Sequence, residues 1–194
     1  MSAIAMTDDL FFNRAGLDRS RAEGIVADAL KGGDDGELFL EFNQSEALSF
    51  DDGKLKSASF DVTQGFGLRA VAGEAHAYAH ASELSEAALK RAAATVKAVH
   101  AGHGGTLAEP PVGTNRHLYS DDNPLAKLDF SAKVEILQQI DAYARAKDPR
   151  VRQVMASISG NWQAVQIIRG DGHQTGSKPG SAQSFLGIGP GWSV

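Results

Sequence analysis

Residues 46–58 read EALSFDDGKLKSA, and this stretch decides which kind of fold the chain adopts. Leu48 and Phe50 alternate with polar residues, and the same alternation resumes after the next turn, so the spacing predicts two half-buried strands. Asp52 and Gly53 lie between the strands, and an Asp-Gly pair supplies the positive φ angles that a tight hairpin turn needs. The stretch therefore predicts an antiparallel hairpin.

Short strands and turns continue on both sides of this hairpin. Residues 37–43 contain a nearly continuous apolar run, Leu38, Phe39, Leu40 and Phe42, and predict a strand. Residues 68–71 and 75–80 predict a further strand pair around a Gly-Glu turn. Residues 64–67 (QGFG) predict a break between strands, because glycine weakens a strand interior. Consecutive strands joined only by turns are expected to pair antiparallel.

Three stretches show the spacing of amphipathic helices. Residues 18–30 begin with a capping aspartate and stop at two glycines, and Ser85 is the expected N-cap of a second helix. Residues 131–146 predict a third helix, which the following Asp-Pro pair ends. Residues 151–159 and 162–168 then predict two strands joined by a Gly-Asn turn.

These elements predict an α+β fold, an antiparallel sheet packed with helices, followed by a second, truncated α+β unit. We place the N-terminal α+β domain at residues 1–108 and a Pro- and Gly-containing linker at residues 109–118. The second domain begins in residues 119–169. Residues 170–194 hold seven glycines without a helical or strand period, so we expect an irregular tail.

Composition narrows the class of function. The 194 residues carry 24 acidic and 19 basic side chains, a net charge of -5, which gives no general attraction to nucleic acid or an anionic membrane. There is no cysteine, hence no disulfide and no thiolate ligand, and no apolar run has the length of a membrane span. The acidic N-terminus does not resemble a signal peptide. We expect a soluble, cytoplasmic protein.

Two local patterns have structural rather than catalytic interpretations. Residues 65–70 (GFGLRA) match a dinucleotide-binding fingerprint, but a strand follows where that motif needs a helix. We therefore expect a glycine turn or bulge where another chain approaches closely. His76, Tyr78 and His80 alternate with alanines and share one face of a strand. The two histidines lack the adjacent glutamate and the third ligand of a metal site. The residues themselves thus indicate no catalytic and no metal-binding group.

Several segments together resemble the TldD/PmbA family. They are the hairpin at residues 46–58, the glycine-containing segment 61–69, the helix at residues 133–151, which is similar to the TldD branch in particular, and residues 154–163. The resemblance extends from about residue 10 to residue 169. No single motif identifies the family; the occurrence of all these segments in the same order does.

The resemblance implies a cytoplasmic zinc metallopeptidase, of a family also described as modulators of DNA gyrase, which degrades or matures unfolded peptides. It further implies a PmbA/TldE partner that lacks the metal site. From the net charge and the missing apolar run we expect neither a nucleic acid nor a membrane as partner. The family's metal ligands lie on a His-Glu-x-x-x-His helix in a C-terminal domain, and no His-Glu dipeptide occurs here. No catalytic or metal residue is therefore carried over, and zinc is expected only in a full-length member.

We therefore expect the N-terminal, peptide-channel-forming portion of a TldD-like metallopeptidase, without peptidase activity of its own, because activated-water catalysis needs a metal and a general base. Substrate contacts are expected at Gln64, Gly65, Phe66, Gly67 and Arg69; the alternative is that these residues only form a turn. The alternative function is a non-catalytic module that binds a peptide or a partner.

The tail departs from the family pattern. The family continues from the last predicted hairpin with an Arg-Pro-Leu-Val-Arg-Leu type of strand, whereas residues 177–185 read SKPGSAQSF. The genetic code allows a DNA sequence for residues 180–185 whose reading frame, shifted by one nucleotide, encodes Ala-Arg-Leu-Asn-Leu. This shifted peptide is closer to the family pattern. We hypothesise a frameshifted ending of a truncated TldD; the alternative is a short paralogue with its own tail.

Overall fold

The computed structural model describes residues 3–100, 104–106, 123–170, 174–177 and 185–189. Within these residues the strands form one sheet in the order β3-β2-β1-β4-β5, and β6 pairs with β4. The chain divides into two compact units. Unit 1 comprises residues 1–42, 63–121 and 164–179, and unit 2 comprises residues 43–62, 122–163 and 180–194. The predicted α+β class, with helices packed on an antiparallel sheet, is confirmed.

The central hairpin joins β1 (Asp35–Asp51) to β2 (Lys54–Ala72), and the predicted turn is confirmed. Asp52 and Gly53 adopt φ angles of +51° and +74°, the left-handed pair that a two-residue hairpin turn requires. The turn is local in sequence, which is why the Asp-Gly pair predicts it correctly.

Both strands of this hairpin are longer than the sequence predicted. β2 continues through residues 64–67, so the predicted break there is wrong, and β1 unites the apolar run 37–43 with Leu48 and Phe50. The predicted hairpin around Gly160 is also wrong, because β4 (Met155–Arg169) passes through it as one strand. A Cβ on Gly160 would lie 2.5 Å from Leu125 Cδ2, so this glycine serves close packing rather than a turn.

Three short strands complete the sheet. β3 (Ala75–Ala81) pairs antiparallel with β2 from Phe66 to Ala72. β5 (Gln174–Ser177) and β6 (Phe185–Gly189) each pair antiparallel with β4, so the expectation of an irregular tail does not hold for these two segments. The predicted linker at residues 109–118 lies outside the described residues.

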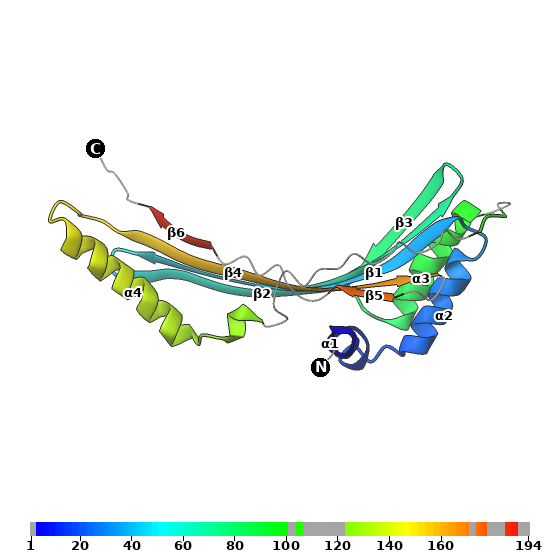
Figure 1. Cartoon of the computed structure of the whole chain (residues 1–194), viewed down its shortest axis with the longest axis horizontal. Helices are drawn as coiled ribbons and strands as arrows, with labels where there is room; N and C mark the ends of the chain where they lie inside the picture. Colours follow the sequence, from blue (N-terminus) through cyan, green and yellow to red (C-terminus); the bar gives the residue numbers. More distant parts are fainter. Residues whose placement is uncertain (1–2, 101–103, 107–122, 171–173, 178–184, 190–194) are drawn as a thin grey trace. The chain divides into compact units, whose positions relative to one another are not determined.

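Unit 1 has helices on one face of its part of the sheet (Figure 1). These are α1 (Ala3–Asp8), the π-helical η1 (Asp9–Asn13), α2 (Arg19–Leu30), α3 (Glu86–Lys97) and the 3-10 turn η2 (Ala98–His100). Asp18 and Ser85 accept hydrogen bonds from the third backbone N–H after them, so both predicted N-caps are confirmed. α2 packs against α3, and α3 packs against β3.

The core of unit 1 alternates along its strands. On β1 and β2 the helix-facing side chains are buried, among them Leu38, Leu40, Phe66 and Leu68. The helices contribute buried side chains to the same layer, including Phe11, Phe12, Val26, Leu30, Leu89 and Val96. Residues between the buried ones on the strands point to the opposite side, which we call the open face of unit 1.

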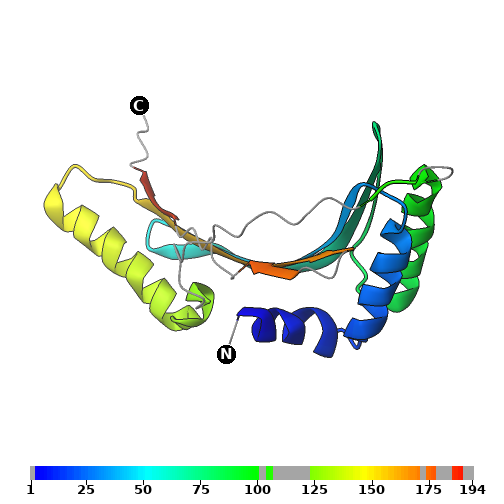
Figure 2. The same cartoon turned by 45° about the vertical axis from the view of Figure 1, so that its right-hand side comes forward.

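Unit 2 has one long helix, α4 (Phe130–Lys147), preceded by the 3-10 turn η3 (Pro124–Ala126). Figure 2 shows α4 lying along the sheet of this unit. Its buried core cluster consists of Leu48, Phe50, Leu137 and Ala156. No helix in the described part of the chain has the length and apolar character needed to span a membrane.

Candidate functional site

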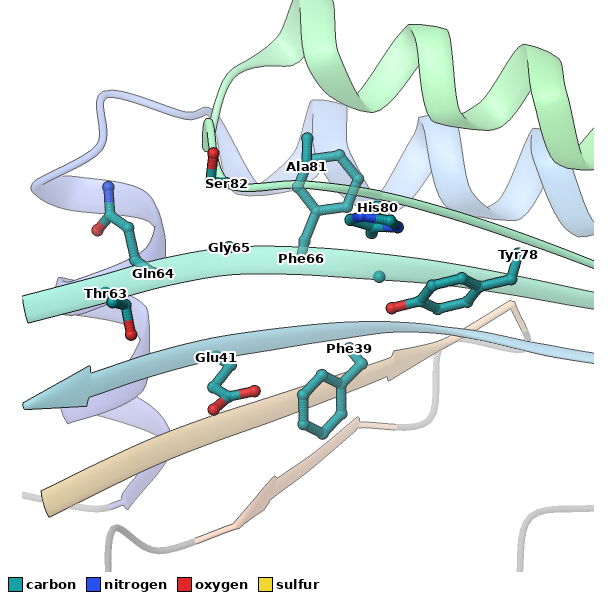
Figure 3. Close-up of a pocket in the computed structure, with 11 residues that line it drawn as sticks. Phe39, Glu41, Thr63, Gln64, Gly65, Phe66, Tyr78, His80, Ala81 and Ser82 are labelled. Carbon is teal, nitrogen blue, oxygen red and sulfur yellow. The ribbon is translucent and has the colours of Figure 1, made fainter. Parts of the chain in front are cut away.

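A groove of about 310 Å³ lies in unit 1 where β3 leaves the sheet. It is lined by residues of β1, β2 and β3 and of the segment after β3: Phe39, Glu41, Thr63, Gln64, Gly65, Phe66, Gly67, Tyr78, His80, Ala81 and Ser82. Figure 3 shows Phe66 pointing toward the helices, whereas Phe39 and Glu41 lie on the other side of the sheet. The open face therefore supplies most of the groove's side chains.

Tyr78 and His80 form an aromatic wall of this groove. Their ring centroids are 5.6 Å apart with an interplanar angle of 26°, so the two rings stack. The Tyr78 side chain is 61% exposed, which leaves most of its ring accessible to a ligand. Because β3 alternates, His76 shares this face, as the sequence predicted, but it does not line the groove.

Two glycines of β2 make room for this wall. A Cβ on Gly67 would lie 2.7 Å from Tyr78 Cε2, so the tyrosine ring covers a position that only glycine leaves open. A Cβ on Gly65 would lie 2.7 Å from the backbone oxygen of Ala81. The two positions match the expectation that glycine here allows close approach of another segment.

The pairing of β2 with β3 stops beside the groove. The last pair is Phe66 with Ala81. Among the described residues, no strand pairs with that edge of β2 at Thr63, Gln64 and Gly65. Backbone N–H and C=O groups on such an edge are available to an added strand.

The predicted substrate contacts separate into two sets. Gln64, Gly65, Phe66 and Gly67 all line the groove, although Phe66 is 6% exposed and faces the helices. Arg69 lies outside the lining. It is opposite Tyr78 in the β2–β3 register, but its guanidinium points to acidic residues of β1.

The sequence did not predict the groove residues outside β2, chiefly Phe39 and Glu41 of β1 and Ser82 after β3. Alternation alone indicates that Phe39 and Glu41 share a face of β1. Their position beside Gly65 and Tyr78 depends on strand order, which no local pattern in the sequence specifies.

Arg69 belongs to a charged cluster on the open face. Asp35 Oδ2 accepts a hydrogen bond from Arg69 Nη2 at 2.7 Å, and Asp35 Oδ1 accepts one from Arg169 Nη2 at 2.8 Å. Burial acts to raise the pKa of the Asp35 carboxyl, but the backbone N–H of Gly36 and the charges of Arg169 and Arg69 outweigh it, so the pKa is lowered. The cluster fixes the ends of β1, β2 and β4 rather than a ligand.

Metal binding has little support in the described residues. Their histidine, aspartate and glutamate side chains form no group of three or more that could hold a metal ion. Glu41 is the one carboxylate among the groove's lining residues. An unpaired strand edge with aromatic side chains beside it has the geometry to bind an extended chain.

The fold and the groove define an α+β sheet protein with an unpaired strand edge in its described part, and comparisons with known proteins identify its family. Residues 36–99 match the PmbA/TldA metallopeptidase domain 1, and residues 123–178 match the PmbA/TldA metallopeptidase central domain. The chain belongs to the PmbA/TldD metallopeptidase family, which confirms the resemblance seen in the sequence.

Relatives extend well beyond the length of this chain. A metalloprotease TldD homolog of Haemophilus influenzae is 35% identical over 139 residues, which cover 70% of this chain and 29% of the relative. A TldD homolog of Buchnera aphidicola from Schizaphis graminum is 28% identical over 141 residues, covering 72% and 29%. The chain thus matches less than a third of these relatives.

Solved structures share the fold. TldE from Thermococcus kodakarensis superposes with a TM-score of 0.62 at 16% identity, covering 87% of this chain and 39% of TldE. A protein of Bacteroides thetaiotaomicron, named for a proposed modulation of DNA gyrase, gives a TM-score of 0.61 at 17% identity, covering 82% and 38%. At such identities the likeness concerns the fold alone.

Proposed function

We propose that this chain is the N-terminal, peptide-binding portion of a TldD-like zinc metallopeptidase. In this proposal the groove of unit 1 holds an unfolded peptide in extended form, and zinc belongs to a region of the full-length family member that this chain does not match. The groove forms part of the channel that admits peptide. The domain division at residues 1–108 and 119–169 and a cytoplasmic location belong to the same proposal.

The observation that carries the proposal is the unpaired edge of β2 beside the groove. An extended peptide added there continues the line of β3 beyond Ser82 and pairs its backbone with residues 63 and 64 irrespective of its sequence. Phe39 and Tyr78 offer apolar contact to alternate side chains of such a peptide. Binding through the backbone suits an enzyme that acts on unfolded chains.

Two substitutions on β3 test this role. Tyr78→Ala removes the ring that lines the groove, and because the side chain is exposed the fold is expected to persist. Fluorescence anisotropy with a labelled, unfolded peptide should show roughly tenfold weaker binding. His76→Ala, on the same strand and face but outside the groove, is the matched control and should bind normally. Equal binding by the Tyr78→Ala variant and the unchanged chain contradicts the proposal.

A second measurement concerns catalysis. The purified chain supplied with zinc should not hydrolyse that peptide, since we place the metal ligands in another part of the family's fold. Hydrolysis that a chelator abolishes would contradict this part of the proposal and leave peptide binding intact.

A second candidate function, a module that binds a PmbA/TldE-like subunit, has its own support. The segment of β2 in unit 2 exposes large apolar side chains, with Leu55 39%, Phe60 58% and Val62 49% exposed. Exposed apolar strands are typical association surfaces. Co-elution with a PmbA/TldE protein in size-exclusion chromatography should be lost in Phe60→Ser and retained in Tyr143→Ser, an exposed residue of α4. If the unchanged chain does not co-elute with the PmbA/TldE protein, this function is contradicted.

A further inference from the structure

Unit 2 contains a larger cavity than the groove of unit 1. It measures about 460 Å³, a volume within the usual range for ligand sites. Its walls come from β1, η3, the start of α4 and β4. The lining is mostly aliphatic, with Leu48, Pro124, Leu125, Leu128 and Ile158.

The polar side chains of the lining are Glu46, Lys127, Lys133 and Ser159, and two of them form a buried ion pair. Lys133 Nζ lies 2.6 Å from Glu46 Oε2, with the two side chains 10% and 12% exposed. Lys133 Nζ also donates a hydrogen bond to the carbonyl oxygen of Leu125 at 2.9 Å. An ammonium group has three N–H donors, so one remains for a further acceptor.

Glu46 has an acceptor oxygen to match the remaining N–H donor of Lys133. The hydrogen bond from Lys133 uses Glu46 Oε2, and within the described residues Glu46 Oε1 accepts none. Glu46 Oε1 is also not a fully buried atom without a partner, so it is accessible from the cavity or from solvent. The ion pair thus presents one donor and one acceptor side by side. This is the complement of an amide group, whose C=O accepts and whose N–H donates.

The wall formed by η3 is fixed in place. Asn123 Oδ1 accepts a hydrogen bond from the Leu125 backbone N–H at 2.9 Å, and Asn123 Nδ2 donates to Gln44 Oε1 at 2.7 Å. Gly160 lacks the Cβ that would displace Leu125. The cavity is therefore preformed, which lowers the entropy that a ligand loses on binding.

We propose that this cavity binds an apolar residue of an extended peptide together with the amide that adjoins it. The aliphatic walls take the side chain, Lys133 donates to the amide carbonyl, and Glu46 accepts from the amide N–H. Within the ion pair the charges of Lys133 and Glu46 balance, so the pair itself favours a neutral group over an added charge that would be desolvated without a partner. Lys127 is a further cation of the lining and has an interaction partner of its own. The site lies in unit 2, so it stands independently of the groove proposed in unit 1.

Blocked amino acids test the chemistry directly. A ¹⁵N-labelled sample of the full chain is titrated with N-acetyl-leucinamide, N-acetyl-glycinamide and free leucine. Leucinamide should give saturable shifts at the amides of Leu125, Leu128 and Gly160. Its affinity should exceed that of glycinamide by roughly tenfold or more, because the leucine side chain is buried. Free leucine, with its two charged ends, should bind more weakly than leucinamide.

Two variants of comparable exposure locate the site. Leu128, 43% exposed, lines the cavity, whereas Tyr143, 64% exposed, lies on α4 outside it. Leu128→Asn should weaken leucinamide binding about fivefold, and Tyr143→Asn should leave it unchanged. Equal affinity for leucinamide and glycinamide, no saturable shift, or shifts at Gly67 and Tyr78 in place of Leu125 would each overturn the proposal. A Tyr78→Ala variant that still binds leucinamide supports a site separate from the groove.

Discussion

Unit 1 covers one face of its sheet with several helices, whereas unit 2 has one long helix, α4, among the described residues. In unit 1 the helix layer contributes buried aromatic and aliphatic residues such as Phe11, Phe12 and Leu89. In unit 2 the buried cluster is Leu48, Phe50, Leu137 and Ala156, and a Lys-Glu ion pair lies at about a tenth exposure. A small core leaves little surplus stability, so single residues of unit 2 carry a larger share of it.

The largest expected effect follows from breaking the buried ion pair of unit 2. Lys133→Met leaves Glu46 charged and nearly buried without its partner, which should lower the free energy of unfolding by about 3–5 kcal/mol. Hydrogen exchange of α4 amides measures the loss. The double variant Glu46→Gln/Lys133→Met should recover most of it. On α3, the exposed pair of Lys90 with Glu86 is the control, and Lys90→Met should have a much smaller effect, because solvent screens an exposed ion pair. Equal losses would contradict the contrast between the units.

Truncation of a core leucine in each unit tests whether each core stabilises only its own unit. Leu137→Ala and Leu89→Ala each remove a buried side chain and should cost about 2–5 kcal/mol. We expect Leu137→Ala to speed hydrogen exchange in α4 while α2 stays protected, and Leu89→Ala to do the reverse. Uniform acceleration over both helices would show that the units open together.

A pair of glycines in unit 1 sharpens the comparison at the groove. Gly65→Ala places a methyl group against the backbone oxygen of Ala81, which cannot rotate away, so it should destabilise by about 1–3 kcal/mol. Gly24 lies in α2 with open space around its Cβ position, and Gly24→Ala should stabilise by up to about 1 kcal/mol. Urea unfolding midpoints give both values. A stabilising Gly65→Ala would refute the close approach at the groove.

The smallest effect is the dependence on pH that Asp35 gives to unit 1. The pKa of Asp35 is lowered in the folded chain from its ordinary value of 3.8. Its contribution is therefore present above that value and is lost as the pH falls through the folded pKa. Between about pH 6 and pH 3 the unchanged chain should lose more stability, measured by urea unfolding, than Asp35→Asn does. Parallel pH profiles would mean that Arg169 and Arg69 do not favour the ionised carboxylate.

The sequence predicts correctly what is determined by neighbours along the chain. The Asp52-Gly53 turn and the caps Asp18 and Ser85 each depend on residues within a few positions, and all three are confirmed. The shared face of His76, Tyr78 and His80 follows from alternation in the same way. In the candidate site, this alternation and the glycine-containing segment were the usable signals.

The errors concern residues whose partners lie far away in the sequence. Gly67 and Gly160 resemble turn residues when only their neighbours are considered, but their function depends on Tyr78 and Leu125, which occupy the space of the missing side chains. The pairing of strands that brings Phe39 to the groove is likewise a property of the sheet order. No local sequence pattern predicts the π-helical turn at Asp9–Asn13.

Three strands, β1, β2 and β4, contribute residues to both compact units, and this bears on how the chain folds during synthesis. The ribosome must release residues 155–163 before unit 2 has its β4 segment, and residues 164–169 before unit 1 has its own. Neither unit is then complete when the hairpin of β1 and β2 emerges. The edge of β1 that pairs with β4 stays unpaired until β4, about 100 residues later in the chain, has been synthesised. A nascent chain of this kind exposes an edge of β1 until β4 has been synthesised, and an exposed strand edge favours aggregation.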